Sequence, residues 1–525
     1  LAAIAGAVMG VSPVPVAIKA GAIYVVARQA AVLTQVLLKR LMHAAVAPRS
    51  RWQPVRLVIG TYLLLIVLGG ALLAVPAATL SDHRNAPYTH TLNSLFMATS
   101  AVTATGLGIY DVSTEYTLFG RTVLLLLMQL GGLAALIFGT LFGLHVARSF
   151  WPQARMLEPW DIARARRIVR WIVLVTLGIE AHGVGLMWSL WAHQPTVFDR
   201  AFSAVFHAVS AFCNVGFTLY KDNLVGMGAA RSIYTIMLPI MVLGGLGAPV
   251  LYEIGWRMKR IIRSSAGTSP ALPVGSVGWS LHTRLVLAAT LCLLAAGTLG
   301  LLFFETPWQH AGFWHTSRGD LLHQDESLQT SPQWMVSHEA PQRTLDALFQ
   351  SASARTAGFK TVLIKTGAIS PASLVLLMML MLVGGSPAST AGGLHTISLV
   401  ILGLAVTSIL RRRKQTSVGG AVIPPGVVRC VLAISLLMMG WLAFAILALA
   451  HTQRADFLVV VFEAVSALTT SGLSLGLTPY LALVGKIVLL LSMLLGRIGL
   501  LVLMLAMADS DTEPRSQISQ PLMVA

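Results

Sequence analysis

Eight apolar segments, each long enough to cross a membrane, constrain this chain more than any other feature of its sequence. They lie near residues 57–78, 120–147, 168–191, 231–256, 284–304, 371–410, 427–450 and 481–508. A transmembrane helix needs about 20 apolar residues to cross hydrocarbon that is roughly 30 Å thick. With 56% hydrophobic and 11% charged residues, the composition is unlike that of a water-soluble domain. The sequence therefore predicts an all-α integral membrane protein with eight spans, the sixth of them interrupted.

The formal net charge of +17 is concentrated in a few segments. Basic residues crowd the segment before the first span and the connections after spans two, four and six: Lys39, Arg40, Arg49, Arg51, Arg56, Arg155, Arg164, Arg166, Arg167, Arg257, Lys259, Arg260, Arg263, Arg411, Arg412, Arg413 and Lys414. These segments share one side if each span crosses once, and the positive-inside rule makes that side cytoplasmic. We therefore expect a multi-pass membrane protein with both termini in the cytoplasm. The pattern argues against a nucleic-acid partner and suits membrane lipids or an acidic regulatory partner.

Other signals are weak or lacking in the sequence. Cys213, Cys292 and Cys430 form no CxxC pair, so neither a disulfide framework nor a zinc site is indicated. The sequence has no Walker loop and no GxGxxG motif after a predicted strand, so we expect this chain to bind no nucleotide or other cofactor itself. Its first 47 residues are apolar but broken by prolines and charges, which suggests an amphipathic leader.

A fourfold internal repeat occupies the connections on the outer side. Three of them share the frame Phe-x-Ala-x-Ser-Ala-x-x-x-x-Gly, which ends at Gly106, Gly216 and Gly472, and a variant ends at Gly358. A small-residue cluster follows each of these glycines in the next span. Repeats of this kind indicate one structural unit used several times. The sequence predicts four pseudo-symmetric helix, pore-loop, helix units around one central pore, with the boundaries 1–55 (leader), 56–147, 148–263, 264–414, 415–508 and 509–525 (tail).

The chemistry of the repeated loops suits a cation. The segment before each glycine is about ten residues long, so as a helix it reaches roughly 15 Å, half the thickness of the hydrocarbon. Its C-terminal end carries a partial negative charge, and the irregular backbone beyond it survives only if it lines a pore. Carbonyls and hydroxyls near the glycines could then replace the hydration shell of an ion. The predicted filter residues are Thr103, Ala104, Thr105, Gly106, Cys213, Asn214, Val215, Gly216, Arg355, Thr356, Ala357, Gly358, Thr469, Thr470, Ser471 and Gly472.

Charged residues near this predicted filter need partners. We expect Arg355 to brace the third loop from behind, with Glu463 as a possible partner, and two separately solvated charges are the alternative. Lys486, near the outer end of span eight, is expected to brace the pore loops rather than meet the ion.

Ten small residues interrupt span six and predict a gate. They are Gly384, Gly385, Ser386, Pro387, Ala388, Ser389, Thr390, Ala391, Gly392 and Gly393, and a regular helix cannot be expected to run through them. An unwound stretch just inside the filter would line the cavity and could block it. Arg497, deep in span eight, costs at least about 2.5 kcal/mol if it has no partner there.

These motifs resemble the Trk/Ktr/HKT superfamily of potassium transporters. The most specific pieces are Ala354–Phe359, the ten small residues from Gly384 and Gly496-Arg497-Ile498-Gly499. The resemblance implies K⁺ held by the filter carbonyls, an intramembrane gating loop contacted by Arg497, a homodimer and a cytoplasmic nucleotide-binding (RCK-type) regulatory ring. Glycine at position 106 is similar to the potassium-selective members, whereas serine there would suggest sodium transport. The outer segment 305–343 is long for the family, and the eight spans favour a Ktr-like arrangement.

Three alternatives remain open at this point. One is a proton-coupled secondary transporter, for which Glu180 and His182 in span three are the candidate residues, although such folds usually lack four re-entrant loops. A sodium-permeable member of the same superfamily is another. The third is an intramembrane enzyme with His310, His315, His323 and His338 as metal ligands, but their spacing matches no zinc pattern, and we expect no enzyme.

Overall fold

The computed structural model describes residues 52–80, 87–150, 162–192, 194–225, 227, 231–265, 278–305, 340–366, 368–413, 415–419 and 421–499. The predicted leader, the C-terminal tail and the histidines of the long outer segment lie outside the described residues.

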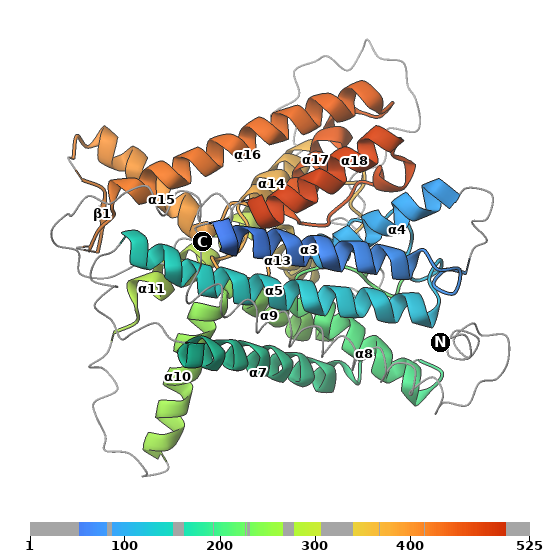
Figure 1. The fold of residues 1–525 in the computed structure, drawn as a ribbon, viewed down its shortest axis with the longest axis horizontal. Helices are drawn as coiled ribbons and strands as arrows, with labels where there is room; N and C mark the ends of the chain where they lie inside the picture. Colours follow the sequence, from blue (N-terminus) through green and yellow to red (C-terminus); the bar gives the residue numbers. More distant parts are fainter. Residues whose placement is uncertain are drawn as a thin grey trace.

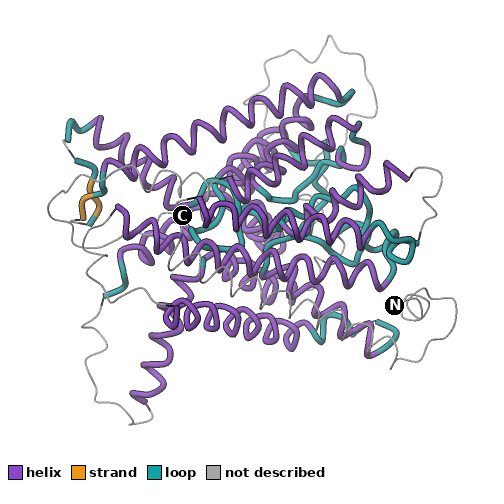
Figure 2. Tube along the Cα trace, in the orientation of Figure 1, coloured by secondary structure: helices purple, strands orange, loops and turns teal. Residues whose placement is uncertain are grey.

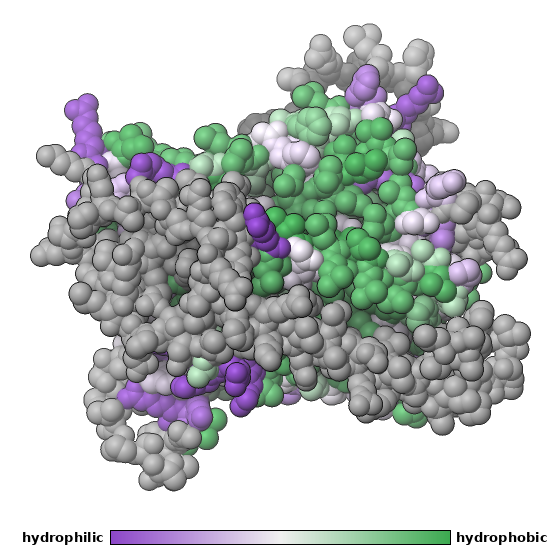
Figure 3. Space-filling model, in the orientation of Figure 1, coloured by the Kyte–Doolittle hydropathy of each residue, from purple (hydrophilic) through white to green (hydrophobic). Residues whose placement is uncertain are grey.

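Long apolar helices form the body of the molecule and run in broadly the same direction (Figure 1). Five described helices are long and apolar enough to cross a membrane: α3 (Trp52–Leu73), α5 (Leu118–Phe150), α7 (Ile162–Met187), α11 (Leu281–Glu305) and α16 (Pro425–Thr452). Apolar side chains cover the face over α16 and α18 (Leu483–Leu494), while hydrophilic ones gather toward its ends (Figure 3). An exposed apolar band of this kind suits contact with lipid, as the sequence predicts.

Four shorter helices lie inside this body and correspond to the predicted pore helices. They are α4 (Pro87–Val102), α8 (Val197–Phe212), α13 (Ala340–Ala354) and α17 (Phe457–Thr469), and a non-helical segment follows each of them (Figure 2). Each packs against the long helix that precedes it, namely α3, α7, α11 and α16. The predicted order of long helix, short helix and loop therefore occurs four times.

Contacts between successive units close into a ring. Helix α5 of the first unit packs on α8 of the second, and α9 (Arg231–Leu246) packs on α13 of the third. In the same way α14 (Pro371–Leu382) packs on α17 of the fourth unit, and α18 packs back on α4 of the first. This cyclic order is what four similar units around one axis require, and it confirms the predicted fold class.

The small-residue clusters let the pore helices approach the following spans. A Cβ added at Gly131, Gly244 or Gly496 would lie 2.1, 2.0 or 1.8 Å from the carbonyl oxygen of Val102, Phe212 or Leu468, respectively. Each of these carbonyls stands four residues before the key glycine of its own repeat. Gly384 departs from this rule, because its added Cβ would meet the carbonyl of Gly392 instead.

Span six is broken, as the small residues predict. Helix α14 ends at Leu382, and α15 (Thr396–Leu410) begins after a non-helical stretch. We call residues 384–393 the small-residue loop. The Gly384 amide bonds the Leu394 carbonyl at 2.9 Å, which closes the loop at its base. A short antiparallel hairpin, β1 (Ser417–Val418) and β2 (Ala421–Val422), follows α15.

Span four is also broken, and the prediction of one continuous crossing over 231–256 was wrong. Helix α9 ends at Leu246, and α10 (Ala248–Ser265) begins two residues later at an angle of 110°. Gly247 makes the corner with a φ of +83°, a conformation that costs other residues more than glycine. Gly244, Gly245 and Gly247 belong to the small-residue cluster that follows Gly216, and such a cluster also suits close helix packing, so it does not by itself predict the break.

Candidate functional site

The four loops that follow the pore helices have one backbone conformation. We call residues 103–106, 213–216, 355–358 and 469–472 the central loops. The φ angle is positive at each key glycine: +83° at Gly106, +88° at Gly216, +74° at Gly358 and +80° at Gly472. It is also positive two residues earlier in every loop, at Ala104, Asn214, Thr356 and Thr470. The pattern of two positive φ angles, two residues apart, therefore repeats in all four copies.

The central loops meet one another in a closed ring. A Cβ added at Gly106 would lie 1.8 Å from the Val215 carbonyl oxygen, and one at Gly216 would lie 2.6 Å from that of Ala357. A Cβ at Gly358 would lie 2.8 Å from the Ser471 carbonyl, and one at Gly472 would lie 2.1 Å from the Thr105 carbonyl. In each loop the key glycine thus faces a carbonyl of the next loop, namely that of the residue just before the next key glycine. The fourth loop faces the first in the same way, so the ring is closed.

Most hydroxyls of the central loops are bonded within the protein. Thr103 donates to the Thr99 carbonyl at 2.7 Å, Thr469 to the Val465 carbonyl at 2.8 Å and Ser471 to the Ala354 carbonyl at 3.2 Å. The Thr356 and Thr470 hydroxyls have no hydrogen-bond partner among the described residues. Since backbone carbonyls face the neighbouring loops, they are the main polar groups at the centre of the ring.

Asn223 joins the second and third central loops from the outer side. Its Nδ2 donates to the carbonyls of Gly216 and Gly358 at 3.2 and 3.4 Å. Its Oδ1 accepts the amides of Leu224 and Lys360, each at 3.0 Å. Its φ of +61° lies in the left-handed region, which asparagine tolerates better than most residues. One side chain therefore sets the spacing of two key glycines.

Glu463 anchors the fourth loop, and its predicted pairing with Arg355 was wrong. The buried carboxylate accepts from the Ser474 hydroxyl, the Leu475 and Leu477 amides at 3.2 and 3.3 Å, and the Thr478 hydroxyl at 2.8 Å. These donors satisfy the hydrogen-bonding capacity of the buried carboxyl group, and Lys360, not Arg355, is the cation that interacts with it electrostatically. Arg355 instead donates to the Gly384 carbonyl at 3.4 Å, so it braces the third loop against the small-residue loop.

Lys486 braces the first pore helix, as expected. Its Nζ donates to Asn93 Oδ1 at 2.8 Å, and Asn93 Nδ2 donates to the Tyr110 hydroxyl at 2.9 Å. Tyr110 lies in the outer segment after Gly106, where burial raises the pKa of its phenol above the ordinary value. The phenol therefore stays protonated at neutral pH, and the chain of contacts links the first and fourth units.

Glu180 and His182 do not form a pair. Glu180 is buried behind the second loop, where it accepts from Gln129 Nε2 at 3.0 Å and from the Cys213 thiol at 3.9 Å. His182 is exposed on the same helix. The Cys213 side chain therefore points away from the ring and toward α7.

The small-residue loop is bonded along one side to the corner between α9 and α10. The Ser386 amide donates to the Gly245 carbonyl at 2.9 Å, the Thr390 amide to the Gly244 carbonyl at 3.2 Å, and the Ala248 amide to the Ala388 carbonyl at 2.9 Å. The Thr390 hydroxyl also donates to the carbonyl of Phe212, the last residue of α8, at 3.0 Å. The break in α9–α10 thus supplies backbone groups that the loop needs.

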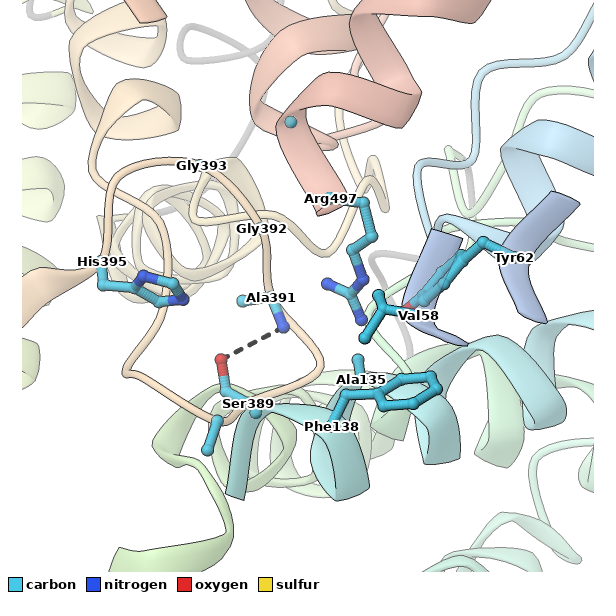
Figure 4. Close-up of a pocket in the computed structure, with 13 residues that line it drawn as sticks. Val58, Tyr62, Ala135, Phe138, Ser389, Ala391, Gly392, Gly393, His395 and Arg497 are labelled. Atoms are coloured by element: carbon cyan, nitrogen blue, oxygen red, sulfur yellow. Dashed lines mark hydrogen bonds between the residues drawn. The ribbon is translucent and has the colours of Figure 1, made fainter. Parts of the chain in front are cut away.

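Arg497 holds the other side of the small-residue loop. Its Nη1 donates to the Thr390 carbonyl at 2.6 Å. Figure 4 shows the guanidinium between the loop backbone near Gly392 and the side chains of Val58 and Tyr62, with His395 on the far side of the loop. These residues line a cavity of about 40 Å³, room for very few water molecules. Arg497 belongs to a π-helical turn, Leu495–Gly499, which often marks a functional site.

Sequence reasoning found the key glycines, Arg497 and Lys486 but missed Asn223 and the role of Glu463 as an anchor. Asn223 stands outside the repeated frame, so the repeat gave no signal for it. Glu463 occupies the position of His207 in the second repeat, which accepts the Leu219 amide at 3.4 Å. A polar residue at that position in two of the four repeats is the signal that could have identified it.

Comparison with known proteins agrees with this architecture. The model of the TrkH family, described as cation transport protein, matches residues 41–515. The Ktr system potassium uptake protein B of Vibrio alginolyticus is 31% identical over 87% of this chain and 91% of its own length. The protein of the same name from Bacillus subtilis is 29% identical over 88% and 94%. The potassium/sodium uptake protein NtpJ of Enterococcus hirae is 27% identical over 90% and 97%.

A solved structure has the same fold. The potassium transporter TrkH from Vibrio parahaemolyticus superposes with a TM-score of 0.64 and 18% identity, over 92% of this chain and 97% of that one. These matches confirm the resemblance to the Trk/Ktr group and the expectation that the protein is a transporter rather than an enzyme. Because the family model covers most of the sequence, this chain belongs to the TrkH family of cation transport proteins.

Proposed function

We propose that this chain carries potassium into a bacterial cell across the inner membrane and that the central loops form its selectivity filter. The closed ring of four glycines and four carbonyls is the observation that carries the proposal. Two relatives with 29 and 31% identity are named potassium uptake proteins. K⁺ is the transported ion here, and no cofactor is proposed for the chain.

The pore helices would favour a cation at this ring. Each ends within a few residues of its central loop, so four partial negative charges converge on one point. The Glu463 carboxyl group lies behind the fourth loop with its oxygens accepting from protein donors, so it would not bind the ion itself. Oxygen ligands from the backbone can replace the hydration shell of K⁺ as it enters.

We propose that the small-residue loop and Arg497 form the gate. The loop is adjacent to the ring, because the Thr470 hydroxyl oxygen would lie 2.2 Å from a Cβ at Gly392. A guanidinium below the filter would raise the barrier to cations, and its bond to Thr390 would hold the loop in place. Opening would require this contact and the backbone bonds at α9–α10 to rearrange.

The remaining assignments follow the family resemblance. We propose a homodimer with one pore per protomer, a cytoplasmic RCK-type ring that controls opening, both termini in the cytoplasm and the repeat boundaries given above. Sodium permeation is the second candidate, because one relative is named a potassium/sodium uptake protein. Proton coupling through Glu180 and His182 loses its support, since the two side chains are not in contact.

Growth of an uptake-deficient bacterium at low potassium tests the proposal. Cells that express this chain with its regulatory partner should grow, and Gly106→Ser should abolish growth or make the cells sensitive to sodium. Gly178→Ala is the matched control, because no atom lies within 4 Å of a Cβ added at that helical glycine. If the surface-expressed chain fails to support growth yet carries another solute, the potassium assignment is overturned.

A further inference from the structure

Helix α10 has a surface that the ion pathway does not use. Figure 1 shows it leaving the bundle across the direction of the other helices, consistent with its angle of 110° to α9. Helix α9 packs against the spanning helix α7 and runs in broadly the same direction as the other long helices (Figure 1), so a helix at this angle to α9 lies close to the plane of the membrane. Its second half, from Arg257 onward, is the basic segment expected at the cytoplasmic surface.

The two long faces of α10 differ in chemistry. Met258, Ile261 and Ile262 share one face by their spacing and are 57, 52 and 64% exposed. Tyr252, Trp256 and Lys259 share another, and Arg260 lies beside it with its guanidinium 5.4 Å from the Trp256 ring. An apolar stripe next to aromatic and basic residues is the composition of helices that lie in a membrane interface.

The orientation of α10 is fixed by contacts near its middle. Glu253 accepts from the Ser280 hydroxyl and the Thr283 hydroxyl, each at 2.6 Å, and from Arg257 at 3.2 Å. Ser280 immediately precedes α11 and Thr283 lies in its first turn, so α10 is tied to the third unit. Within the described residues Glu253 pairs with Arg257, and Lys259 and Arg260 have no carboxylate partner. Their charges remain available to an external anion.

We propose that α10 lies in the cytoplasmic leaflet, binds anionic lipid headgroups through Lys259 and Arg260, and so holds the small-residue loop in position. The binding of lipid by α10 does not depend on the proposed function; only the expected effect of lipid on transport rests on it. Charge complementarity and the exposed apolar face select lipid as the occupant, because an anionic lipid offers a charged headgroup to Lys259 and Arg260 and acyl chains to the exposed Ile261 and Ile262. The three backbone hydrogen bonds at the α9–α10 corner transmit the position of α10 to the loop.

An environment-sensitive fluorophore on α10 tests the binding. It is attached after Ile262→Cys in the full chain carrying Cys292→Ser, since Cys213 and Cys430 are buried. The protein is reconstituted in phosphatidylcholine vesicles or in an equal mixture with phosphatidylglycerol. In the mixture we expect the emission of the probe to shift to the blue, and we expect quenchers attached to the lipids to reduce its intensity. Each basic residue near an anionic surface favours binding about fivefold, so K259Q/R260Q should lower the preference for phosphatidylglycerol by more than tenfold.

The control R411Q/R413Q removes the same charge from the end of α15 and should leave the probe unchanged. A probe that stays in water in both vesicles overturns the proposal. Equal insertion of the probe in both vesicles, with K259Q/R260Q behaving like the unsubstituted chain, also overturns it. The same holds if the probe leaves water only when a regulatory ring or a second copy of the chain is present.

Rubidium flux in the same vesicles tests the link to the gate. We expect flux to depend on phosphatidylglycerol and this dependence to disappear in K259Q/R260Q. If flux does not depend on the lipid composition while the emission of the probe does, the link to the small-residue loop is overturned. No flux in any lipid, with the probe result intact, would count against the proposed potassium function and leave the lipid site standing.

Discussion

The Arg497 guanidinium reaches the Thr390 carbonyl at 2.6 Å, and this contact joins the last described helix to the loop that interrupts span six. Thr390 is bonded to three other groups, the Gly244 carbonyl, the Phe212 carbonyl and the Asn214 amide. One residue thus connects the end of a pore helix, a central loop, the α9 corner and a partly buried cation. Changes at this point should affect opening more than ion selectivity.

Removal of the Arg497 charge should increase flux. At an effective dielectric constant near 20, a unit charge about 8 Å from a permeating ion contributes about 2 kcal/mol to its barrier, or about thirtyfold in rate. We expect Arg497→Gln to raise rubidium uptake by tenfold or more without the regulatory partner. Arg411→Gln, an exposed charge at the end of α15, serves as the control and should leave uptake unchanged. Unaltered uptake in Arg497→Gln would remove this residue from the gate.

Loss of the Asn223 side chain should weaken selectivity. Asn223→Gly keeps access to the left-handed backbone and removes the bonds to Gly216 and Gly358, so it separates the side chain from backbone strain. Loss of such hydrogen bonds costs about 1 kcal/mol each, and we expect the preference for potassium over sodium to fall about tenfold. Competition of sodium against rubidium uptake measures it. A folded Asn223→Gly with wild-type selectivity would contradict the role of Asn223.

Neutralising Glu463 should destabilise the fourth loop. In Glu463→Gln an amide NH₂ replaces one carboxylate oxygen and faces donors, so at least one bond is lost, at a cost of about 1.5 to 3 kcal/mol. The melting temperature in detergent should fall, and bound potassium should restore only part of this decrease. His207→Gln, at the same position in the second repeat, is the comparison and should have a smaller effect. An unchanged melting temperature would mean that the carboxylate is not the anchor.

The corner between α9 and α10 should not tolerate a side chain. A Cβ at Gly247 would lie 2.5 Å from the Pro387 carbonyl, and the positive φ costs a further 1 to 2 kcal/mol or so. We expect Gly247→Ala to lower thermal stability and to disturb gating. Gly255→Ala on α10 is the matched control, since its nearest neighbour is 3.7 Å away, and it should be neutral or slightly stabilising. Equal stability of the two variants would argue against a strained corner.

The repeat made the architecture predictable, because a pore loop needs a glycine at the same position in every copy. Gly106, Gly216, Gly358 and Gly472 were found by spacing alone, and the break in span six followed from its ten small residues. The break in span four could not be found in this way, because its stretch of glycines also suits helix packing. Only the exchange of backbone hydrogen bonds with the small-residue loop favours the corner at Gly247.

Long-range side-chain contacts were the least predictable part of the site. Arg355 stands in a central loop and Glu463 in a pore helix, so their pairing was a reasonable expectation, but Arg355 bonds a carbonyl of the small-residue loop and Glu463 bonds hydroxyls and amides beyond its own loop. Lys486 was assigned correctly because a buried lysine near the outer end of a span has few alternatives. Asn223 contacts Gly358, 135 residues away, and such a pairing leaves no local pattern in the sequence.

The most direct test of the central claim is ion competition in vesicles that contain only this chain, using rubidium-86 uptake inhibited by potassium or by sodium. If the ring of carbonyls selects potassium, potassium should compete at least about tenfold better than sodium, a difference of about 1.4 kcal/mol, and Gly106→Ser should bring the two ions close to equal. Equal competition by both ions in the wild-type chain, or selectivity unchanged in Gly106→Ser, would contradict the assignment of the central loops as a potassium filter.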